Sequence, residues 1–314
     1  MKSNFRNKTM RDSFFDSLYK IAKKDKNVYL ITADMGAPSL DKYRVDLKGQ
    51  FINVGIAEEN MVLIATGLSL CGKKVYIYAI MPFVTARCYE MLKVDLSLMN
   101  IPVTAIGVGA GFGYDDSGPT HHSTEDISIM RALPNFYIFS PSDSLMAYKL
   151  AEMTYKLKFP SYVRLDRKVL PLIYNKNDNF SDGLSVLKNG KDFYIIGTGN
   201  MTHRAIEVAE ELEKFNINAG VIDLYRIKPI NAELLIETIK ATKGIITIEE
   251  HLLAGGMGSA IIEVLIDNGI NLPVKRFGVK DKYLYAYGGR ENIQKICGLD
   301  KESIVKDILN WKAN

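Results

Sequence analysis

The sequence has 314 residues, enough for two domains, and its 47% hydrophobic and 24% charged residues are typical of an ordinary globular protein. Its net charge of +4 comes from 40 basic and 36 acidic residues with no basic block, which argues against nucleic acid as a partner. No apolar run is long enough to span a bilayer and the basic N-terminus leads directly into an amphipathic pattern, so neither a membrane anchor nor a signal segment is expected.

The first half of the chain alternates between strand-like and helix-like segments. After an initial amphipathic helix, the predicted strands cover residues 28–32, 51–54, 74–79, 103–108, 137–139 and 161–165, and further helices begin near residues 58, 83, 125 and 142. The helix that begins near residue 83 is expected to run unbroken to residue 99. Such alternation predicts a mainly parallel sheet with helices on both faces.

A polar stretch rich in Asn, Asp and Ser separates this half from a second one. Beyond it, strands are predicted at 193–197, 219–222, 244–248 and 274–277, and helices at 202–215, 232–241, 258–267 and from 301 onwards. We therefore expect two doubly wound α/β domains, residues 1–168 and 191–314, joined by a linker over 169–190.

One stretch of the first half places two acidic residues between a predicted strand and a predicted helix, which is a candidate functional site. An apolar run, 51–54, stops at Gly55, and a helical pattern opens on the paired acids Glu58 and Glu59. Acids are common in first helical turns because they interact favourably with the helix dipole, and the spacing alone favours this interpretation. The alternative is a carboxylate at the carboxyl end of a strand, where open α/β sheets bind their ligands.

The loop predicted over residues 109–124 contains four glycines and Pro119, too many for regular structure. The sequence has no Walker-type Gly-x-x-x-x-Gly-Lys-Ser/Thr motif, and the glycines from Gly107 to Gly111 lack the strand-turn-helix context of a dinucleotide site. A Gly-Asp-Gly motif followed by Asn, which would hold a metal and a diphosphate, is also missing. If the protein uses a phosphorylated cofactor, something else must therefore grip the phosphates.

The cysteines point to a reducing compartment. Cys71, Cys88 and Cys297 are odd in number and far apart in sequence, which is typical of reduced thiols in a protein core and not of a disulfide framework or a metal site. We therefore expect a cytoplasmic protein.

Several short motifs follow one another along the chain. They are Asn53-Val-Gly-Ile-Ala-Glu58, Phe83-Val-Thr-Ala-Arg87, Gly118-Pro-Thr-His-His122, Arg131-Ala-Leu-Pro-Asn135 and Pro141-Ser-Asp143 in the first half, and Glu249-Glu250-His251, Gly255-Gly256 and Gly258-Ser259 in the second. In this order they resemble the pyrimidine-binding and C-terminal domains of transketolases and of 1-deoxyxylulose-5-phosphate synthase. The resemblance covers nearly the whole chain, and it lacks the domain that binds magnesium and the diphosphate of thiamine diphosphate.

The resemblance implies a thiamine diphosphate site. It gives Glu58 the role of the carboxylate that shares a proton with N1′ of the aminopyrimidine, and Phe83 that of the aromatic ring that stacks on the pyrimidine. Phe83 could equally be a core residue. Arg87 and Asp34 are implied cofactor contacts, although the Asp34 loop carries one inserted residue relative to transketolases.

The resemblance also implies substrate contacts. His121 is the stronger candidate, and His122 the second, for binding sugar hydroxyls or assisting proton transfer, with Asp116 in the same polar pocket. The two histidines are not expected to bind a metal, because adjacent side chains rarely converge on one ion. Arg167 matches an arginine that grips the substrate phosphate, but it could also be an exposed arginine at a domain edge.

These features together suggest the small subunit of a split transketolase, which transfers a two-carbon ketol unit between sugars. A partner subunit would hold Mg²⁺ and the diphosphate, and we expect a heterotetramer with a homodimeric core. Alternatives are a synthase-like subunit, a 2-oxoacid dehydrogenase β subunit with the same two domains, or a regulatory or scaffolding relative without activity. The sequence does not identify the sugars.

Overall fold

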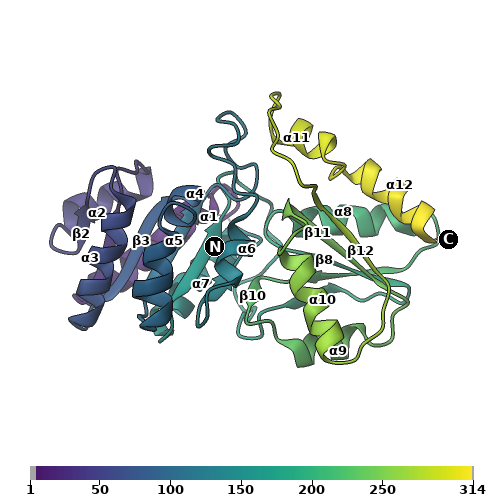
Figure 1. Cartoon of the computed structure of the whole chain (residues 1–314), viewed down its shortest axis with the longest axis horizontal. Coiled ribbons are helices and arrows are strands. Elements are labelled where there is room, and N and C mark those ends of the chain that lie inside the picture. Colours follow the sequence, from purple (N-terminus) through teal and green to yellow (C-terminus); the bar gives the residue numbers. More distant parts are fainter. Residues whose placement is uncertain (1–4, 313–314) are drawn as a thin grey trace.

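A computed structural model describes residues 5–312 and contains two β-sheets that lie side by side, each flanked by helices (Figure 1). The two sheets confirm the expectation of two α/β domains in series. Within the described residues, no helix is both long enough and apolar enough to cross a membrane.

The first sheet has seven strands in the order β10-β5-β6-β4-β3-β1-β2. Six of them come from the first half of the chain and are parallel to one another: β1 (Val28–Thr32), β2 (Phe51–Asn53), β3 (Lys74–Ile80), β4 (Thr104–Val108), β5 (Tyr137–Phe139) and β6 (Ser161–Leu165). The seventh, β10 (Arg226–Lys228), comes from the second half and runs antiparallel to β5.

Helices cover both faces of this sheet. They are α1 (Met10–Lys24), α2 (Asp41–Asp46), α3 (Glu58–Leu70), α4 (Met81–Val84), α5 (Tyr89–Met91), α6 (Asp126–Arg131) and α7 (Ser144–Lys156), with a 3-10 helix at Pro38–Leu40 and a π-helix at Leu92–Leu98. On one face α1 and α7 pack against Tyr76 and Tyr78, and on the other α3, α4 and the π-helix pack against Val75 and Ile77. Because alternate residues of β3 face two cores, the strand has no charged residue after Lys74.

The second sheet has five strands in the order β12-β11-β8-β9-β7. Its strands are β7 (Ser185–Lys188), β8 (Phe193–Gly197), β9 (Ala219–Asp223), β11 (Ile245–Leu252) and β12 (Val274–Val279), and its helices are α8 (Met201–Glu213), α9 (Ala232–Ile239), α10 (Met257–Asp267), α11 (Arg290–Ile296) and α12 (Lys301–Lys312). Residues of α8 and α12 belong to one core of this half, and residues of α9 and α10 belong to the other.

The prediction of an unbroken helix over residues 83–99 was wrong. The chain instead forms α4, a turn, α5 and the π-helix. Side chains compete with the helical hydrogen bonds at the break: the Thr85 hydroxyl donates to the carbonyl of Met81 at 2.7 Å, and the Cys88 thiol donates to the carbonyl of Phe83 at 3.1 Å. The break aims Phe83 and Arg87 at the carboxyl edge of the sheet.

Short elements that pair over long sequence distances were not predicted. The segment expected to be a linker, 169–190, contains β7, which pairs antiparallel with β9. The edge strand β10 and the helices α2 and α11 were also missed. Each has eight residues or fewer, too few to show a clear hydrophobic period.

Candidate active site

The carboxyl ends of the parallel strands meet at one edge of the first sheet, and the predicted site residues follow them. Asp34 lies after β1, Glu58 after β2, Phe83 after β3, His121 in the long loop after β4, and Arg167 after β6. In Figure 1 the loop after β4 rises above this edge, next to the segment that precedes α11. Ligands of open α/β sheets bind at such an edge, so the topology brings separate motifs to one place.

Glu58 is the first residue of α3 and is 4% exposed, whereas Glu59 is exposed. Nη1 of Arg87 donates to Oε2 of Glu58 at 2.7 Å, and within residues 5–312 this is the one hydrogen bond that the Glu58 carboxylate accepts. Adjacent residues of a helix do not share a face, so the two acids have different surroundings. The helix dipole acts on both of them and does not account for the burial of one.

Phe83 lies beside this ion pair. The guanidinium carbon of Arg87 is 4.1 Å from the centroid of the Phe83 ring, a cation–π contact. The rings of Phe83 and His121 also pack in a T-shaped arrangement, with 5.2 Å between ring centroids. Phe83 is only half-buried, so it is not simply a core residue.

The row of contacts continues into the loop after β4. The ring of His121 lies 5.9 Å from that of Tyr114, and the guanidinium carbon of Arg167 lies 4.5 Å from the Tyr114 ring centroid. Nη1 of Arg167 is also 3.5 Å from Oδ1 of Asp116. Both members of that ion pair are largely exposed, so the pair orients the guanidinium without contributing much stability. We call Glu58, Arg87, Phe83, His121, Tyr114 and Arg167 the site row.

Tyr114 is a member of the site row that the sequence did not reveal. An aromatic residue in a glycine-rich loop was its only signal. Its ring lies against Gly109, where φ is +99° and an added Cβ would come within 2.3 Å of a ring carbon. Glycine at this position therefore allows the ring to sit between His121 and Arg167.

Three predicted residues lie outside the site row, and one of them, Asp116, pairs with Arg167 at its end. His122 is buried, packs against Phe112 with 5.1 Å between ring centroids, and has an Nε2 atom without a hydrogen-bond partner among the described residues. Burial lowers the pKa of His122, which favours the neutral ring. Asp34 is exposed with φ +49°, and its N–H donates to Oδ1 of Asn53 at 3.0 Å. Asp34 therefore lies on the rim at the end of β1.

A buried ionic cluster fastens the site loop to the second half of the chain. The guanidinium of Arg290 binds Asp166 at 2.7 Å and Glu250 at 2.5 Å. Glu250 also accepts the backbone N–H of Phe112 at 3.1 Å, and Arg290 donates its own backbone N–H to Asp115 at 2.8 Å. Although burial opposes the charge, the two carboxylates hold the pKa of Arg290 above its ordinary value.

The motif Glu249-Glu250-His251 is explained by packing. Glu249 accepts the backbone N–H groups of Met257 and Gly258 at 2.6 and 2.9 Å and so caps α10. His251 accepts the N–H of Ile127 at 3.1 Å, which joins β11 to α6. Burial lowers the pKa of His251 to about 4, so the ring stays neutral and keeps this acceptor.

Arg164 in β6 and Arg167 in the loop after it have different roles, because only Arg164 forms a buried ion pair. Nε of Arg164 donates to Asp126 at 2.7 Å, and the Tyr162 hydroxyl donates to the same carboxylate at 2.8 Å. Arg164 is therefore structural, whereas Arg167 is exposed at the site. Within the described part of the chain, no group of three or more His, Cys, Asp or Glu side chains is arranged to hold a metal ion.

Comparison with known protein families assigns both halves of the chain. Residues 6–172 match the model described as "Transketolase, pyrimidine binding domain", and residues 183–304 match "Transketolase, C-terminal domain". The second match begins just before β7, inside the segment expected to be a linker.

Individual relatives agree with these matches. The chain is 35% identical to an apulose-4-phosphate transketolase subunit of Phocaeicola vulgatus, over 96% of each chain. It is 31% identical to a 6-deoxy-6-sulfo-D-fructose transketolase subunit of a Clostridium species, over 95% of this chain and 92% of the relative. A solved split-gene transketolase, described as an inactive beta4 tetramer, has a TM-score of 0.85 at 29% identity, and the match covers 96% of this chain and 97% of the solved one. The chain therefore belongs to the transketolase family, and it corresponds to the pyrimidine-binding and C-terminal domains of that family.

Proposed function

We propose that this chain is the pyrimidine-binding subunit of a split transketolase, which transfers a two-carbon ketol unit between sugars once it is joined to a second subunit. The second subunit holds Mg²⁺ and the diphosphate of thiamine diphosphate, and this chain holds the aminopyrimidine. The observation that carries the proposal is the buried carboxylate of Glu58 beside the half-exposed ring of Phe83, at the carboxyl edge of the sheet. Membership of the transketolase family supports it.

The residues of the site row suit an aminopyrimidine. Such a ring needs an apolar surface for its face and a carboxylate for a ring N–H. Phe83 supplies the surface, and Glu58 supplies the carboxylate, one oxygen of which is engaged by Arg87. Asp34 lies at the neighbouring strand end, and together with Arg87 it completes the cofactor contacts that we propose.

Each of the residues that we place beside the cofactor then has a separate role. Thiamine diphosphate, when bound, supplies the nucleophilic carbon that attacks the sugar carbonyl. Glu58 holds a proton at N1′ of the aminopyrimidine and takes it back, which only a titratable group can do. Arg87 fixes the orientation of the Glu58 carboxylate through their ion pair. Phe83 keeps water away from the cofactor side of this pair.

The other end of the site row is proposed to bind the sugar. His121 binds hydroxyl groups of the substrate and assists proton transfer at a hydroxyl oxygen. Arg167, oriented by Tyr114 and Asp116, binds the substrate phosphate, because its planar fork can donate two hydrogen bonds at once. His122 acts behind the site as a positioning residue, since its ring packs on Phe112 in the fastened part of the loop.

A heterotetramer with a homodimeric core is the assembly we propose. Leu63 and Leu70 lie seven residues apart on one face of α3 and are exposed, and so are Leu98 and Met99 at the end of the adjacent π-helix. Exposed apolar residues gathered in this way are typical of protein interfaces. The tetramer described for the split-gene relative supports self-association. We also propose a cytoplasmic location, which three free thiols support, although Cys71 is exposed and not in the core as expected.

The direct test is reconstitution. The chain is mixed with a candidate diphosphate-binding subunit, thiamine diphosphate and Mg²⁺, and ketol transfer is followed with a panel of ketose donors and aldose acceptors. The panel includes phosphorylated, sulfonated and unmodified sugars, because the two relatives are named for different sugars. Transfer that needs both subunits supports the proposal.

The alternatives give different readouts when pyruvate is added to the same mixture. A synthase-like or 2-oxoacid dehydrogenase subunit releases CO₂ from a 2-oxoacid, whereas a transketolase uses a ketose donor and releases none. A regulatory relative binds the partner subunit without any turnover. CO₂ release from pyruvate in place of ketose-dependent transfer would overturn the proposed reaction while leaving the cofactor assignment intact.

A further inference from the structure

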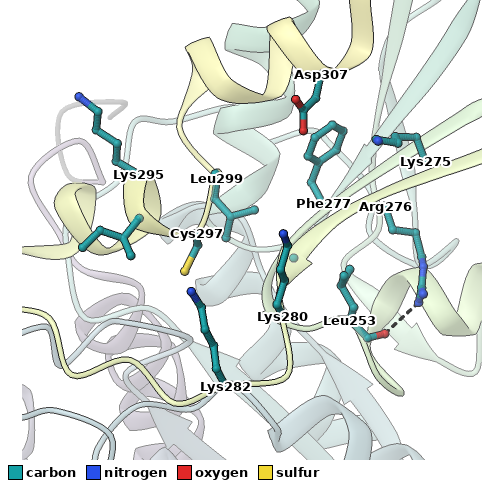
Figure 2. A pocket seen from close by; sticks show the side chains of 13 residues that line it. Leu253, Lys275, Arg276, Phe277, Lys280, Lys282, Lys295, Cys297, Leu299 and Asp307 are labelled. Atoms are coloured by element: carbon teal, nitrogen blue, oxygen red, sulfur yellow. Dashed lines mark hydrogen bonds between the residues drawn. The ribbon is translucent and has the colours of Figure 1, made fainter. Parts of the chain in front are cut away.

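The second half of the chain contains a cavity of about 450 Å³ that belongs to no part of the site row. Its walls come from β12, the loop that follows β12, α11 and α12, with Leu253 at one side (Figure 2). Small-molecule sites commonly have volumes of roughly 300–1,000 Å³, so the cavity can hold a metabolite.

The side chains that line the cavity are mostly positively charged. Five cationic side chains line the cavity, Lys275, Arg276, Lys280, Lys282 and Lys295, against a single carboxylate, Asp307. Within residues 5–312, none of these cations forms an ion pair with a carboxylate. Like charges gathered around one hollow repel one another, and an anion inside it relieves that repulsion.

The cations approach the cavity from different elements. Figure 2 shows Lys280 and Lys282 reaching from the loop after β12 towards Cys297 and Leu299, whereas the ammonium group of Lys295, from α11, points away from them. Arg276, from β12, is held in place because its Nη1 donates to the carbonyl of Leu253 at 2.9 Å and to the Ser259 hydroxyl at 3.1 Å. One guanidinium is therefore fixed in position at the Leu253 side of the cavity, apart from the flexible ammonium groups of Lys280 and Lys282.

The floor of the cavity is apolar and uncharged. Phe277 and Leu299 are buried there, and burial raises the pKa of the Cys297 thiol to about 11 despite the nearby Lys282. Gly278 allows Leu253 to pack closely against β12, because an added Cβ would come within 2.8 Å of a Leu253 methyl group. An occupant thus meets an apolar surface on one side and cations around it.

We propose that this cavity binds a small organic phosphate, with its phosphate groups at Lys280 and Lys282 and its organic part on Phe277 and Leu299. A phosphate group carries about two negative charges near neutral pH, more than a carboxylate, and is therefore attracted more strongly by a pair of ammonium groups. The concave shape and limited volume favour a small molecule over the surface of an acidic protein. None of the lining residues takes part in the proposed ketol transfer, so the site stands apart from that reaction.

The test is titration calorimetry on the full chain at low salt, with ADP and inorganic pyrophosphate as probes. Binding of ADP is expected, and it should be tighter than that of pyrophosphate because only ADP has an apolar part for the floor. The double variant Lys280→Met/Lys282→Met should weaken ADP binding by about tenfold or more, since each step of 1.4 kcal/mol is a factor of ten. The variant Asp307→Asn should strengthen it, because a repelling charge is lost.

The matched control is Lys191→Met/Lys306→Met, which removes two positive charges from exposed lysines that do not line the cavity. Equal weakening in both double variants would mean that only net charge matters, and would overturn the proposal. Failure of both probes to bind would overturn it too. Binding of polyglutamate without ADP would assign the cavity to an acidic protein instead. The assay involves no turnover, so its outcome is independent of the proposed transketolase reaction.

Discussion

At the scale of single residues, the acid pair at the start of α3 bears on two explanations that the sequence left open, a favourable interaction with the helix dipole and a role in ligand binding. Glu58 is buried against Arg87, while Glu59 is exposed one position along the same helical turn. A helix dipole accounts for both acids equally. The burial of one acid beside an aromatic ring and an arginine is what a ligand-binding role predicts.

Glu58→Gln should abolish most turnover in the reconstituted complex and leave the fold intact. Glutamine has the size of glutamate and can still form hydrogen bonds, but it cannot accept a proton at N1′. General acid–base groups commonly contribute about 10²- to 10⁴-fold, so the loss of kcat should lie in that range. Circular dichroism checks the fold, and ketol transfer under saturating donor gives kcat.

Glu59→Gln is the control for this variant, since it makes the same charge change on an exposed face of the helix. It should retain nearly wild-type turnover. If the two variants lose activity equally, or if Glu58→Gln stays active, the helix-dipole explanation is the correct one for both acids.

The free energy of unfolding should decrease in mild acid because His251 is buried in its neutral form. Its pKa falls from the usual 6.5 to about 4 in the folded state because of burial, beside Asp126 and Arg164. Since the unfolded chain takes up the proton first, the stability that His251 provides is complete above about pH 6.5 and is lost as the pH falls towards 4. The full loss amounts to about 3 kcal/mol.

Urea unfolding of the wild type and of His251→Asn at about pH 7 and about pH 5 measures this effect. Glu249 and Asp223 act in the opposite direction, because burial raises their pKa values to about 7 and their contribution is lost as the pH rises. Both acids are present in both proteins, so the part of their pH dependence that does not involve His251 cancels in the difference between the two. That difference should shrink at the lower pH, and a constant difference would refute the prediction.

At the scale of elements, the loop after β4 shows how backbone conformation positions side chains. Gly109 begins the loop with φ +99°, and Tyr114 folds back over it. The loop is fastened at Phe112 through Glu250 and at Asp115 through Arg290. His121 and Tyr114 therefore project from a segment that is tied to the second half of the chain on its inner side.

Gly109→Ala should both destabilise the protein and displace the site loop. A non-glycine residue at positive φ costs about 1–3 kcal/mol, and here the new methyl group would also collide with the Tyr114 ring at 2.3 Å. Gly72→Ala is the matched control, because Gly72 also has positive φ, +79°, but nothing lies within 4 Å of its added Cβ. Urea unfolding should show the larger loss for Gly109→Ala. Equal losses would mean that Tyr114 moves aside without cost.

At the scale of the whole molecule, the two halves are joined by buried ion pairs and by a strand. Arg290 and Glu250 connect the loop after β4, the end of β6 and α11, and β10 crosses over to complete the first sheet. The two halves are therefore expected to unfold together and not as independent domains.

Glu250→Gln should destabilise the whole chain by about 3–5 kcal/mol, because it removes one partner of a buried pair and leaves Arg290 undercompensated. The control is Glu263→Gln, which breaks the pair with Arg131 at an exposed carboxylate and should cost less than about 1 kcal/mol. Two probes should report the losses in urea, namely the Trp311 fluorescence of the second half and overall circular dichroism. Transitions that separate in the wild type would contradict cooperative unfolding.

Assembly gives the last prediction. The chain alone should form a dimer or a larger self-association through its first half, bind thiamine diphosphate weakly, and catalyse no ketol transfer. Light scattering gives the mass, and calorimetry with Mg²⁺ gives the affinity. Leu63→Asp/Leu70→Asp should shift the mass towards the monomer, because two charges would be buried in an apolar contact. A strictly monomeric wild type, alone and with the partner, would refute the pairing, and micromolar binding with turnover in the isolated chain would refute the need for a partner.

The sequence by itself determined the order of the main strands and helices and the motif around Glu58. Both signals are local. An apolar period is visible within a dozen residues, and the strand, Gly55 and the two acids that follow it all lie within nine consecutive residues, 51–59. These signals sufficed to predict two α/β domains, and the resemblance of the ordered motifs to transketolases implied Glu58, Phe83, His121 and Arg167 as site residues.

Only the tertiary structure decided which of these residues touch. Tyr114 joins His121 to Arg167, and His122 turns towards Phe112, because the loop after β4 is fastened to residues more than a hundred positions away. The crossing of β10 into the first sheet and the pairing of β7 with β9 likewise depend on partners distant in sequence. Such contacts leave no period or spacing in one chain, since they arise from the packing of one segment against another.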